Sequence, residues 1–140
     1  MSEFLAIGRA ALQSQPFSTL IGASLAHFAP GEAVIEVPIS EQVKQQNGFV
    51  HGGVVSYCAD NVITFAGGSV LGTGVVTSEF KINYLRPAIG DKLVARASVL
   101  HAGKTQAVCR CEVYAVTGGE EKLCAAAQGT IARIGTDTPK

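Results

Sequence analysis

The longest apolar segment of the chain, Gly52 to about Leu71, constrains the fold more than any other stretch. It is apolar on almost every side of a helix, so we predict a helix buried on most faces rather than along one stripe. The polar exceptions Ser56, Asp60 and Thr64 recur every four residues, which places them along one seam of the helix. An ionised carboxylate among apolar neighbours is costly unless it is paired or hydrogen-bonded. Asp60 is therefore a candidate functional acid.

The two ends of this segment carry helix-terminus signals. His51, Gly52 and Gly53 open it, and unpaired amides at a helix N-terminus attract negative charge. Taken alone, His51 fits better as a loop histidine that satisfies the helix terminus, and the two glycines that follow favour the functional role instead. The run AGGSVLGTG over residues 66–74 ends the helix, with three glycines that suit a C-cap: Gly67, Gly68 or Gly72.

Length and composition indicate one globular domain over residues 1–140, with 47% hydrophobic residues for a core. Lys plus Arg and Asp plus Glu number 11 each, without blocks of like charge, which disfavours nucleic acid and acidic membranes as partners. Residues 1–20 have an acid at position 3 and no basic region before a long apolar run, so they predict a short amphipathic helix. We expect a cytoplasmic protein without a membrane span, because Asp60, Asn61 and glycines interrupt the apolar helix.

Cysteine and histidine usage indicates no metal site. The four cysteines contain no CxxC pair and are typical of small buried hydrophobes in a reducing compartment. The three histidines lack a second ligand at a metal-site interval.

Strand signals lie on both sides of the apolar helix. Alternating residues and turn dipeptides predict a hairpin, a half-buried strand before Arg86-Pro87, and an antiparallel meander. The ranges are 21–28 with 33–39, 78–84, and then 92–101, 106–117 and 121–134, while 41–47 reads as a loop. We therefore expect an α+β domain in which a curved antiparallel sheet wraps one long central helix.

A helix apolar on nearly every side needs more cover than one sheet provides. The small residues Gly52, Ser56, Asp60, Thr64 and Gly68 lie near one line and permit a second copy of the chain to approach closely. We expect a homo-oligomer, either a dimer or a dimer of dimers.

The ordered motifs resemble the hotdog-fold acyl-CoA thioesterases of the phenylacetate-pathway type. The matching features are an HGG tripeptide at residues 51–53 with Gly48 three residues before its histidine, Asp60 nine residues after it, Thr77, the run NYLRP over 83–87, and VLHAGKT over 99–105. The last is similar to a hairpin that lies near coenzyme A in relatives. Many relatives have an asparagine six residues before the HGG histidine, where this chain has Gln45, with Asn47 two residues later.

The resemblance implies hydrolysis of an acyl-CoA to a carboxylic acid and free coenzyme A, with no further cofactor. Asp60 would be general base or nucleophile, the amides of Gly52 and Gly53 would face the oxyanion beside His51, and Thr77 would hold water or the carboxylate. Gln45 or Asn47 would contact the acyl carbonyl or position Asp60. Substrate contacts would come from Tyr84 and Arg86, and from Gly103, Lys104 and Thr105. The acyl group is expected to be small and aromatic or of medium chain length.

Helix geometry adds a constraint. Eight residues separate Gly52 from Asp60, or roughly 12 Å along the axis, which is too far for an oxyanion site and its base in one chain. Two antiparallel helices across a twofold axis would bring the Asp60 of one subunit to the Gly52 of the other.

Several alternatives compete with these assignments. Asp60 is otherwise a buried cap, or an ion pair with Lys81 or Arg86. The Gly103-Lys104-Thr105 run is not a phosphate loop, because position 98 is serine and a strand follows. A hotdog dehydratase would need His and Glu on the helix, which has no Glu. The remaining rival is a non-catalytic acyl-CoA-binding or regulatory hotdog domain.

Overall fold

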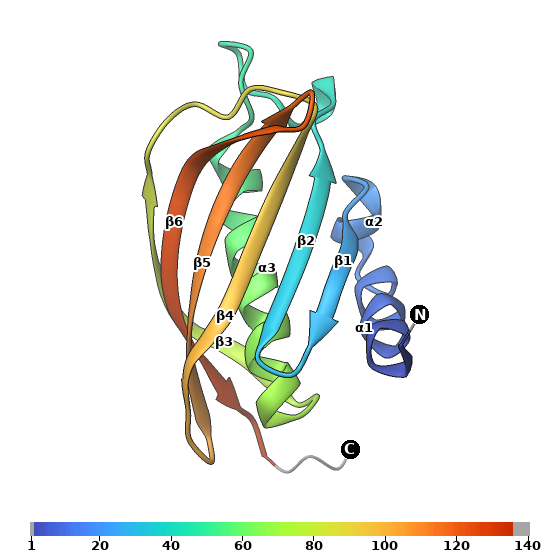
Figure 1. The fold of residues 1–140 in the computed structure, drawn as a ribbon, viewed down its shortest axis with the longest axis vertical. Coiled ribbons are helices and arrows are strands. Elements are labelled where there is room, and N and C mark those ends of the chain that lie inside the picture. Colours follow the sequence, from blue (N-terminus) through green and yellow to red (C-terminus); the bar gives the residue numbers. More distant parts are fainter. Residues whose placement is uncertain (1, 136–140) are drawn as a thin grey trace.

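One antiparallel sheet of six strands curves around a single long helix in the computed structural model, which describes residues 2–135 (Figure 1). This confirms the expected α+β architecture. The elements in chain order are α1 (Glu3–Gln13), α2 (Pro16–Leu20), β1 (Ser24–Ala29), β2 (Glu32–Pro38), the 3-10 helix η1 (Glu41–Val43), α3 (Gly52–Leu71), β3 (Val75–Tyr84), β4 (Lys92–Ala102), β5 (Gln106–Thr117) and β6 (Glu120–Arg133).

The sheet has the strand order β1-β2-β4-β5-β6-β3. The hairpin β1-β2 and the meander β4-β5-β6 confirm the predicted connections. The strand after the helix, β3, pairs with β6 at the far edge, so residues 85–91 return the chain across the end of the sheet to β4. Residues 41–47, expected to be a loop, contain the 3-10 helix η1, and Lys44 pairs with Val50 in an isolated β-bridge.

The N-terminal segment differs from the single helix expected over residues 1–20. Proline has no N–H and disfavours helical backbone at the preceding residue, and Gln15 is accordingly extended, with φ −90° and ψ 110°. Pro16 therefore starts a second helix, α2, and β1 begins at Ser24 rather than at Ile21. Figure 1 shows α1 and α2 beside β1, on the flank of the domain.

Helix α3 has the predicted bounds and packs one half of its surface against the sheet. Its buried residues are Val54, Val55, Cys58, Ala59, Val62, Ile63, Ala66, Gly67 and Leu71. The close approach depends on Gly67, where an added Cβ would lie 2.6 Å from the Cβ of Ile131 on β6. Gly72, with φ 107°, ends the helix. By length and composition α3 would suit a membrane span, but half of that window is buried inside the fold, as in the core helix of a globular domain.

The opposite half of α3 is only partly covered by the described residues. The predicted seam of Gly52, Ser56, Asp60, Thr64 and Gly68 lies on this half, and each of the five is half-buried. The seam lies along the edge strand β3, whose Thr77 and Tyr84 form hydrogen bonds to it, and it is left only partly covered, as a surface for a second subunit requires.

Strand β3 carries a β-bulge between Thr77 and Glu79. Strict alternation predicted Ser78, Phe80 and Ile82 on one face. The extra residue places Ser78 outside, exposed, and turns Thr77 to the half-buried face with Phe80. The bulge thus aims the Thr77 hydroxyl at α3.

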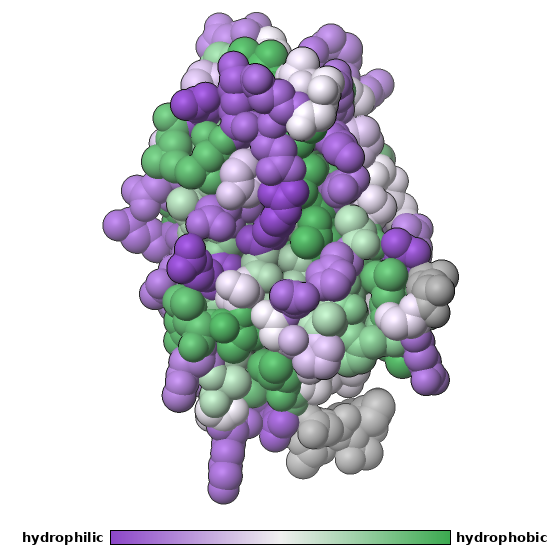
Figure 2. All heavy atoms as spheres, in the orientation of Figure 1, coloured by the Kyte–Doolittle hydropathy of each residue, from purple (hydrophilic) through white to green (hydrophobic). Residues whose placement is uncertain are grey.

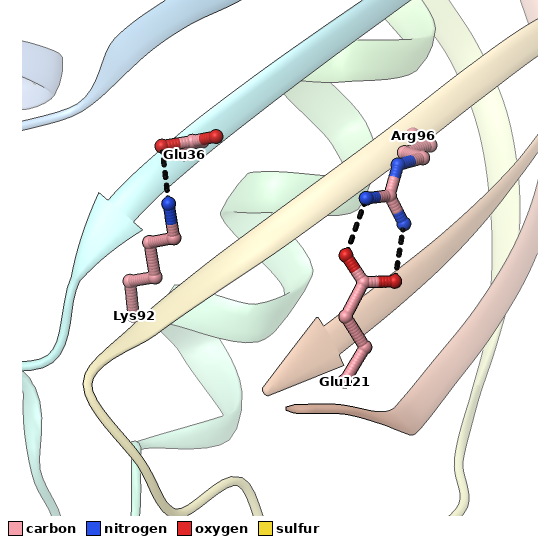
Figure 3. A network of polar contacts seen from close by, with 4 residues as sticks. All are labelled: Glu36, Lys92, Arg96 and Glu121. Carbon is pink, nitrogen blue, oxygen red and sulfur yellow. Dashed lines mark hydrogen bonds and ion pairs between the residues drawn. The ribbon is translucent and has the colours of Figure 1, made fainter. Parts of the chain in front are cut away.

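The outer face of the sheet carries paired charges. Arg96 on β4 forms two hydrogen bonds with Glu121 on β6, while Lys92 pairs with Glu36 at 3.1 Å (Figure 3). The Arg96 guanidinium also lies 5.0 Å from the ring centroid of Tyr114. The Arg96 hydrogen bonds lower the pKa of Glu121. Figure 2 shows hydrophilic side chains across this side of the molecule, with hydrophobic groups between them.

Candidate active site

The first turn of α3 leaves one backbone amide open. His51 is the N-cap, and its Nδ1 accepts from the Gly53 N–H at 2.8 Å, while the Val54 and Val55 amides reach the His51 carbonyl at 2.9 and 3.3 Å. Among residues 2–135 no acceptor pairs with the Gly52 amide. His51 thus has the capping role that its position alone suggested. Of the two amides expected to face an oxyanion, only that of Gly52 is open in this structure.

The open end of α3 borders a pocket of about 400 Å³. Gly52, Gln45, Tyr84 and Arg86 line it, with apolar residues that include Phe49 and Leu85. The Tyr84 hydroxyl lies 2.9 Å from Ser56 Oγ and donates to the Gly52 carbonyl at 3.2 Å, so it ties β3 to this end of the helix. The pocket is therefore apolar along most of its length, with a cation at its rim.

Gln45 and Asn47 were the two candidates for the role of the asparagine that precedes the HGG histidine in many relatives, and they differ in position. Gln45 is half-buried and lines the pocket beside Gly52, whereas Asn47 is exposed and lies outside it. The Asn47 amide donates to Gln45 Oε1, which leaves the Gln45 Nε2 as an unpaired donor among the described residues. Gln45 is the better placed of the two to contact a substrate in this pocket.

Asp60 is held by two threonines. Thr77 on β3 donates to Asp60 Oδ1 at 2.6 Å, and Thr64 donates to the Asp60 carbonyl at 2.8 Å, with the two hydroxyls 2.9 Å apart. Within residues 2–135 the second carboxylate oxygen has no hydrogen-bond partner, and Asp60 forms no ion pair with Lys81 or Arg86. The ion-pair alternative is therefore wrong. One oxygen is fixed and the other is available to a ligand.

Asp60 opens into a second, smaller pocket of about 210 Å³. Thr64 and Thr77 form one side of it, and a group of four hydrogen-bonded side chains forms the other: Gln15, Ser18, Tyr57 and Asn61. Burial raises the pKa of the Tyr57 hydroxyl, although its hydrogen bonds with Ser18 and Asn61 act in the opposite direction.

The sequence did not predict this group of four. Tyr57 and Asn61 were identifiable as polar groups one turn apart on an apolar helix. No local pattern indicates that Gln15 and Ser18, some 40 residues earlier, meet them.

Gly52 and Asp60 of one chain do not share a pocket. They lie in the separate pockets of about 400 and 210 Å³, at opposite ends of two helical turns. This agrees with the axial separation of about 12 Å that the helix rise requires.

The expected substrate contacts also divide between two ends of the domain. Tyr84 and Arg86 lie at the start of α3, and Arg86 lines both the Gly52 pocket and a neighbouring cavity of about 640 Å³. Gly103, Lys104 and Thr105 form the β4–β5 turn at the other end, where Arg133 links the Thr105 carbonyl to that of Leu71, the last residue of α3. All three turn residues are exposed. One chain does not bring the two sets together (Figure 1).

The described residues hold no cluster of three or more His, Cys, Asp or Glu side chains that could bind a metal ion. All four cysteines are free and buried in the core.

Comparison with known proteins identifies the same region. Residues 47–122, more than half of the chain, match the family model of the thioesterase superfamily. The chain is 31% identical to human acyl-coenzyme A thioesterase 13 over 105 residues, 71% of this chain and 73% of that protein. It is also 31% identical to the acyl-coenzyme A thioesterase PaaI of Escherichia coli over 116 residues, 82% of this chain and 80% of the relative.

Solved structures are similar over most of the chain. A thioesterase family protein from Silicibacter pomeroyi superposes with a TM-score of 0.84 at 33% identity, covering 89% of this chain and 93% of that one. The PaaI protein of the Escherichia coli phenylacetic acid degradation operon superposes with a TM-score of 0.82 at 28% identity, covering 91% of each chain.

Proposed function

The chain belongs to the thioesterase superfamily, with the hotdog fold of its phenylacetate-pathway type, and from that premise we propose that it hydrolyses a small aromatic or medium-chain acyl-CoA. The products are a carboxylic acid and free coenzyme A. One observation carries the proposal. Asp60 is held by Thr77 with one oxygen free on the outward half of α3, the same helix whose N-terminus leaves the Gly52 amide open.

The Gly52 amide is proposed to stabilise the charge that develops on the thioester oxygen. It lies at the positive end of a 20-residue helix, and a pre-oriented donor aimed at a developing oxyanion is effective because it needs no reorganisation. The Gln45 Nε2 is proposed as a second donor, since it lines the same pocket. Gly53 contributes indirectly, because its amide is occupied by His51.

Asp60 is proposed to act on the carbonyl carbon in one of two ways. As general base it takes a proton from water, whose oxygen bonds to that carbon. The C–S bond then breaks, and the thiolate accepts a proton. As nucleophile it forms an acyl–Asp60 anhydride and expels the thiolate, and water then cleaves the anhydride. After a single turnover in H₂¹⁸O, label found in Asp60 identifies the nucleophilic route, because only hydrolysis at the anhydride's aspartyl carbonyl places it there.

A homodimer with antiparallel α3 helices is proposed to complete each site. If Asp60 of one chain meets the partner subunit's Gly52, the twofold axis passes near Ser56, midway between them. Small residues on the seam favour this approach, and the half-buried state of the seam in one chain supports it. Two equivalent sites result.

The coenzyme A part of the substrate is proposed to be bound by side chains of the protein, and the reaction is proposed to need no separate cofactor. Tyr84 and Arg86 flank the pocket at Gly52, where Arg86 would meet phosphate as a charged contact. The exposed turn of Gly103, Lys104 and Thr105 would contribute from a different subunit, since it lies at the other end of its own chain.

The test is thiol release from a panel of aryl- and alkyl-acyl-CoAs, measured with a chromogenic disulfide reagent. The buried cysteines keep the protein's own background low. Asp60→Asn is expected to lower kcat by about 10²- to 10⁴-fold, whereas Glu41→Gln, an exposed acid paired only with Lys44, is expected to match the wild type. Undiminished turnover by Asp60→Asn would remove the proposed mechanism. Binding of acyl-CoA without turnover in the wild type would favour a non-catalytic binding domain.

A further inference from the structure

A mostly apolar groove of about 260 Å³ runs between α1 and the C-terminal half of α3. Ile7 and Ala11 of α1 form one wall, and Phe28 and Phe65, whose rings meet edge to face at 5.4 Å, lie on the other side. The polar members of its lining are Gln15, Asn61, Thr64 and Thr73. Three of these four gather at one end, so the groove has a polar mouth and an apolar body.

The polar mouth adjoins the pocket of Asp60. Gln15, Asn61 and Thr64 line both spaces, and Thr64 is one of the two threonines that hold Asp60. From Thr64 the groove follows α3 to Gly72, eight residues or about 12 Å along the helix axis. An acyl group whose carbonyl is attacked at Asp60 would therefore find this groove directly beside it.

We propose that this groove holds the acyl group of the substrate and that Ile7 and Ala11 of α1 set the size of acyl group that is accepted. The inference rests on the proposed thioesterase function and adds a specificity site to it. A cavity of about 150 Å³ is enough for benzene. A groove of about 260 Å³ therefore has room for an aryl ring with a short linker or for an alkyl chain of similar volume.

The wall formed by α1 is held in place by a closed ring of hydrogen bonds. Asn61 Nδ2 donates to Gln15 Oε1 at 3.0 Å and to the Tyr57 hydroxyl at 3.1 Å, and Ser18 donates to Gln15 Oε1 at 2.6 Å. Because the single Ser18 proton is used, the 2.5 Å contact between Ser18 and Tyr57 requires Tyr57 as donor.

This ring of hydrogen bonds joins the α1–α2 junction to α3, and the donor and the acceptor of each bond are assigned. Ser18 is only 1% exposed, so these bonds are shielded from water at their centre. Gly8 adds a second constraint, since a Cβ there would lie 2.5 Å from Phe28 and 2.7 Å from Leu25. These contacts fix the position of helix α1 relative to Phe28 and α3. A fixed α1 is required if its side chains are to limit the size of the acyl group.

The experiment compares kcat/KM across an acyl-CoA series from acetyl to dodecanoyl, with phenylacetyl-CoA added. Ala11→Leu fills the groove and is expected to lower kcat/KM by about tenfold or more for phenylacetyl and octanoyl, while acetyl and butyryl change by less than about threefold. Ile7→Ala, an exposed position on the same wall, is expected to shift the optimum to longer chains. Ala10→Leu is the matched control, because Ala10 is exposed on α1 outside the groove.

A chain-length profile in Ala11→Leu parallel to that of the wild type, or an equal change in Ala10→Leu, would overturn the assignment of the groove. So would a change of oligomeric state in Ala11→Leu without a change of profile, because the groove would then hold a neighbouring subunit. A wild-type protein inert toward the whole series would instead contradict the proposed function itself. The two failures are thus distinguishable.

Discussion

At the scale of single residues, the candidate site has one open amide and one carboxylate with a free oxygen. The Gly52 N–H is open because the first amides of a helix have no acceptor one turn earlier, and the His51 cap is taken by the Gly53 amide. Thr77 fixes one oxygen of Asp60 and leaves the other without a partner among the described residues. The two groups can be tested separately.

Replacing Gly52 with proline removes the amide N–H while retaining the helix. Gly52 is the first helical residue, where proline is favoured, and the preceding His51 has φ −58° and ψ 134°, which proline tolerates. We expect Gly52→Pro to lower kcat by about 10²- to 10³-fold. Gly52→Ala keeps the N–H, and its Cβ would lie 3.6 Å from Tyr84, an ordinary contact. Steady-state kinetics of the two variants check this, and equal rates would contradict an oxyanion role.

The Thr77 hydroxyl is expected to be needed for turnover, because it fixes the Asp60 carboxylate. Thr77→Val removes a hydrogen bond to a carboxylate, worth about 1.5–3 kcal/mol, and should reduce kcat by about tenfold or more. Thr77→Ser retains the hydroxyl and should recover most of the activity. Paired measurements of kcat and thermal midpoint distinguish the roles. If serine fails to restore kcat, the methyl group rather than the hydroxyl is what matters.

At the scale of elements, two backbone features bring α3 and β3 together. The bulge after Thr77 turns that side chain toward Asp60, and glycines permit close packing of helix on sheet. On β6, an added Cβ at Gly129 would lie 2.6 Å from the Cβ of Phe80 and 2.8 Å from the Glu79 carbonyl of β3. The edge strand and the helix are thus positioned by residues without side chains.

The two adjacent glycines of α3 should respond oppositely to alanine. Gly67→Ala would place its Cβ within 2.9 Å of three Ile131 atoms, and we expect a loss of about 1–3 kcal/mol in the free energy of unfolding. Gly68→Ala meets only Val75, at 3.4 Å, and should be neutral or stabilising because alanine favours helix. Urea unfolding of both variants checks this. Equal destabilisation would contradict this expectation, because contact with Ile131 would then not distinguish Gly67 from Gly68.

At the scale of the whole molecule, the separation of Gly52 and Asp60 predicts subunit complementation. A mixed dimer of Asp60→Asn and Gly52→Pro chains would contain one site with both defects and one with neither. We therefore expect co-expressed, co-purified mixed dimers to recover a substantial fraction of wild-type activity, although the kcat of each variant alone is expected to fall at least about 100-fold. If each site lay within one chain, both sites of the mixed dimer would be defective and no activity would return.

The buried thiols predict a loss of stability in alkali. Burial raises the pKa of Cys109 and of Cys124 to about 11 and that of Cys111 to about 12, against a reference of 9.0. Above pH 9 the unfolded chain therefore binds fewer protons than the folded one, so the free energy of unfolding, fully present below pH 9, falls as pH rises toward 11. Urea midpoints at pH 8 and 10.5 measure this. Cys109→Ala should show a smaller fall, and an unchanged slope would contradict the assignment.

Local patterns in the sequence were sufficient to predict the helix and strands whose signals lie within their own residues. The composition of Gly52–Leu71 marked a long helix at the core of the fold, and period-two alternation with turn dipeptides marked β4, β5 and β6. The seam through Ser56, Asp60 and Thr64 followed from the helical period alone. The family resemblance supplied Thr77 and the type of chemistry, and the thioesterase family is confirmed by comparison.

What the tertiary structure alone decided involves contacts between distant residues. The placement of β3 at the far edge, the bulge that redirects Thr77, and the ring that joins Gln15 to Asn61 each depend on partners 13 or more residues away. A local period reports which face of an element is apolar, because burial acts on each residue separately. Which elements meet across that face depends on shape and on hydrogen-bond geometry in three dimensions, and no local period carries that information.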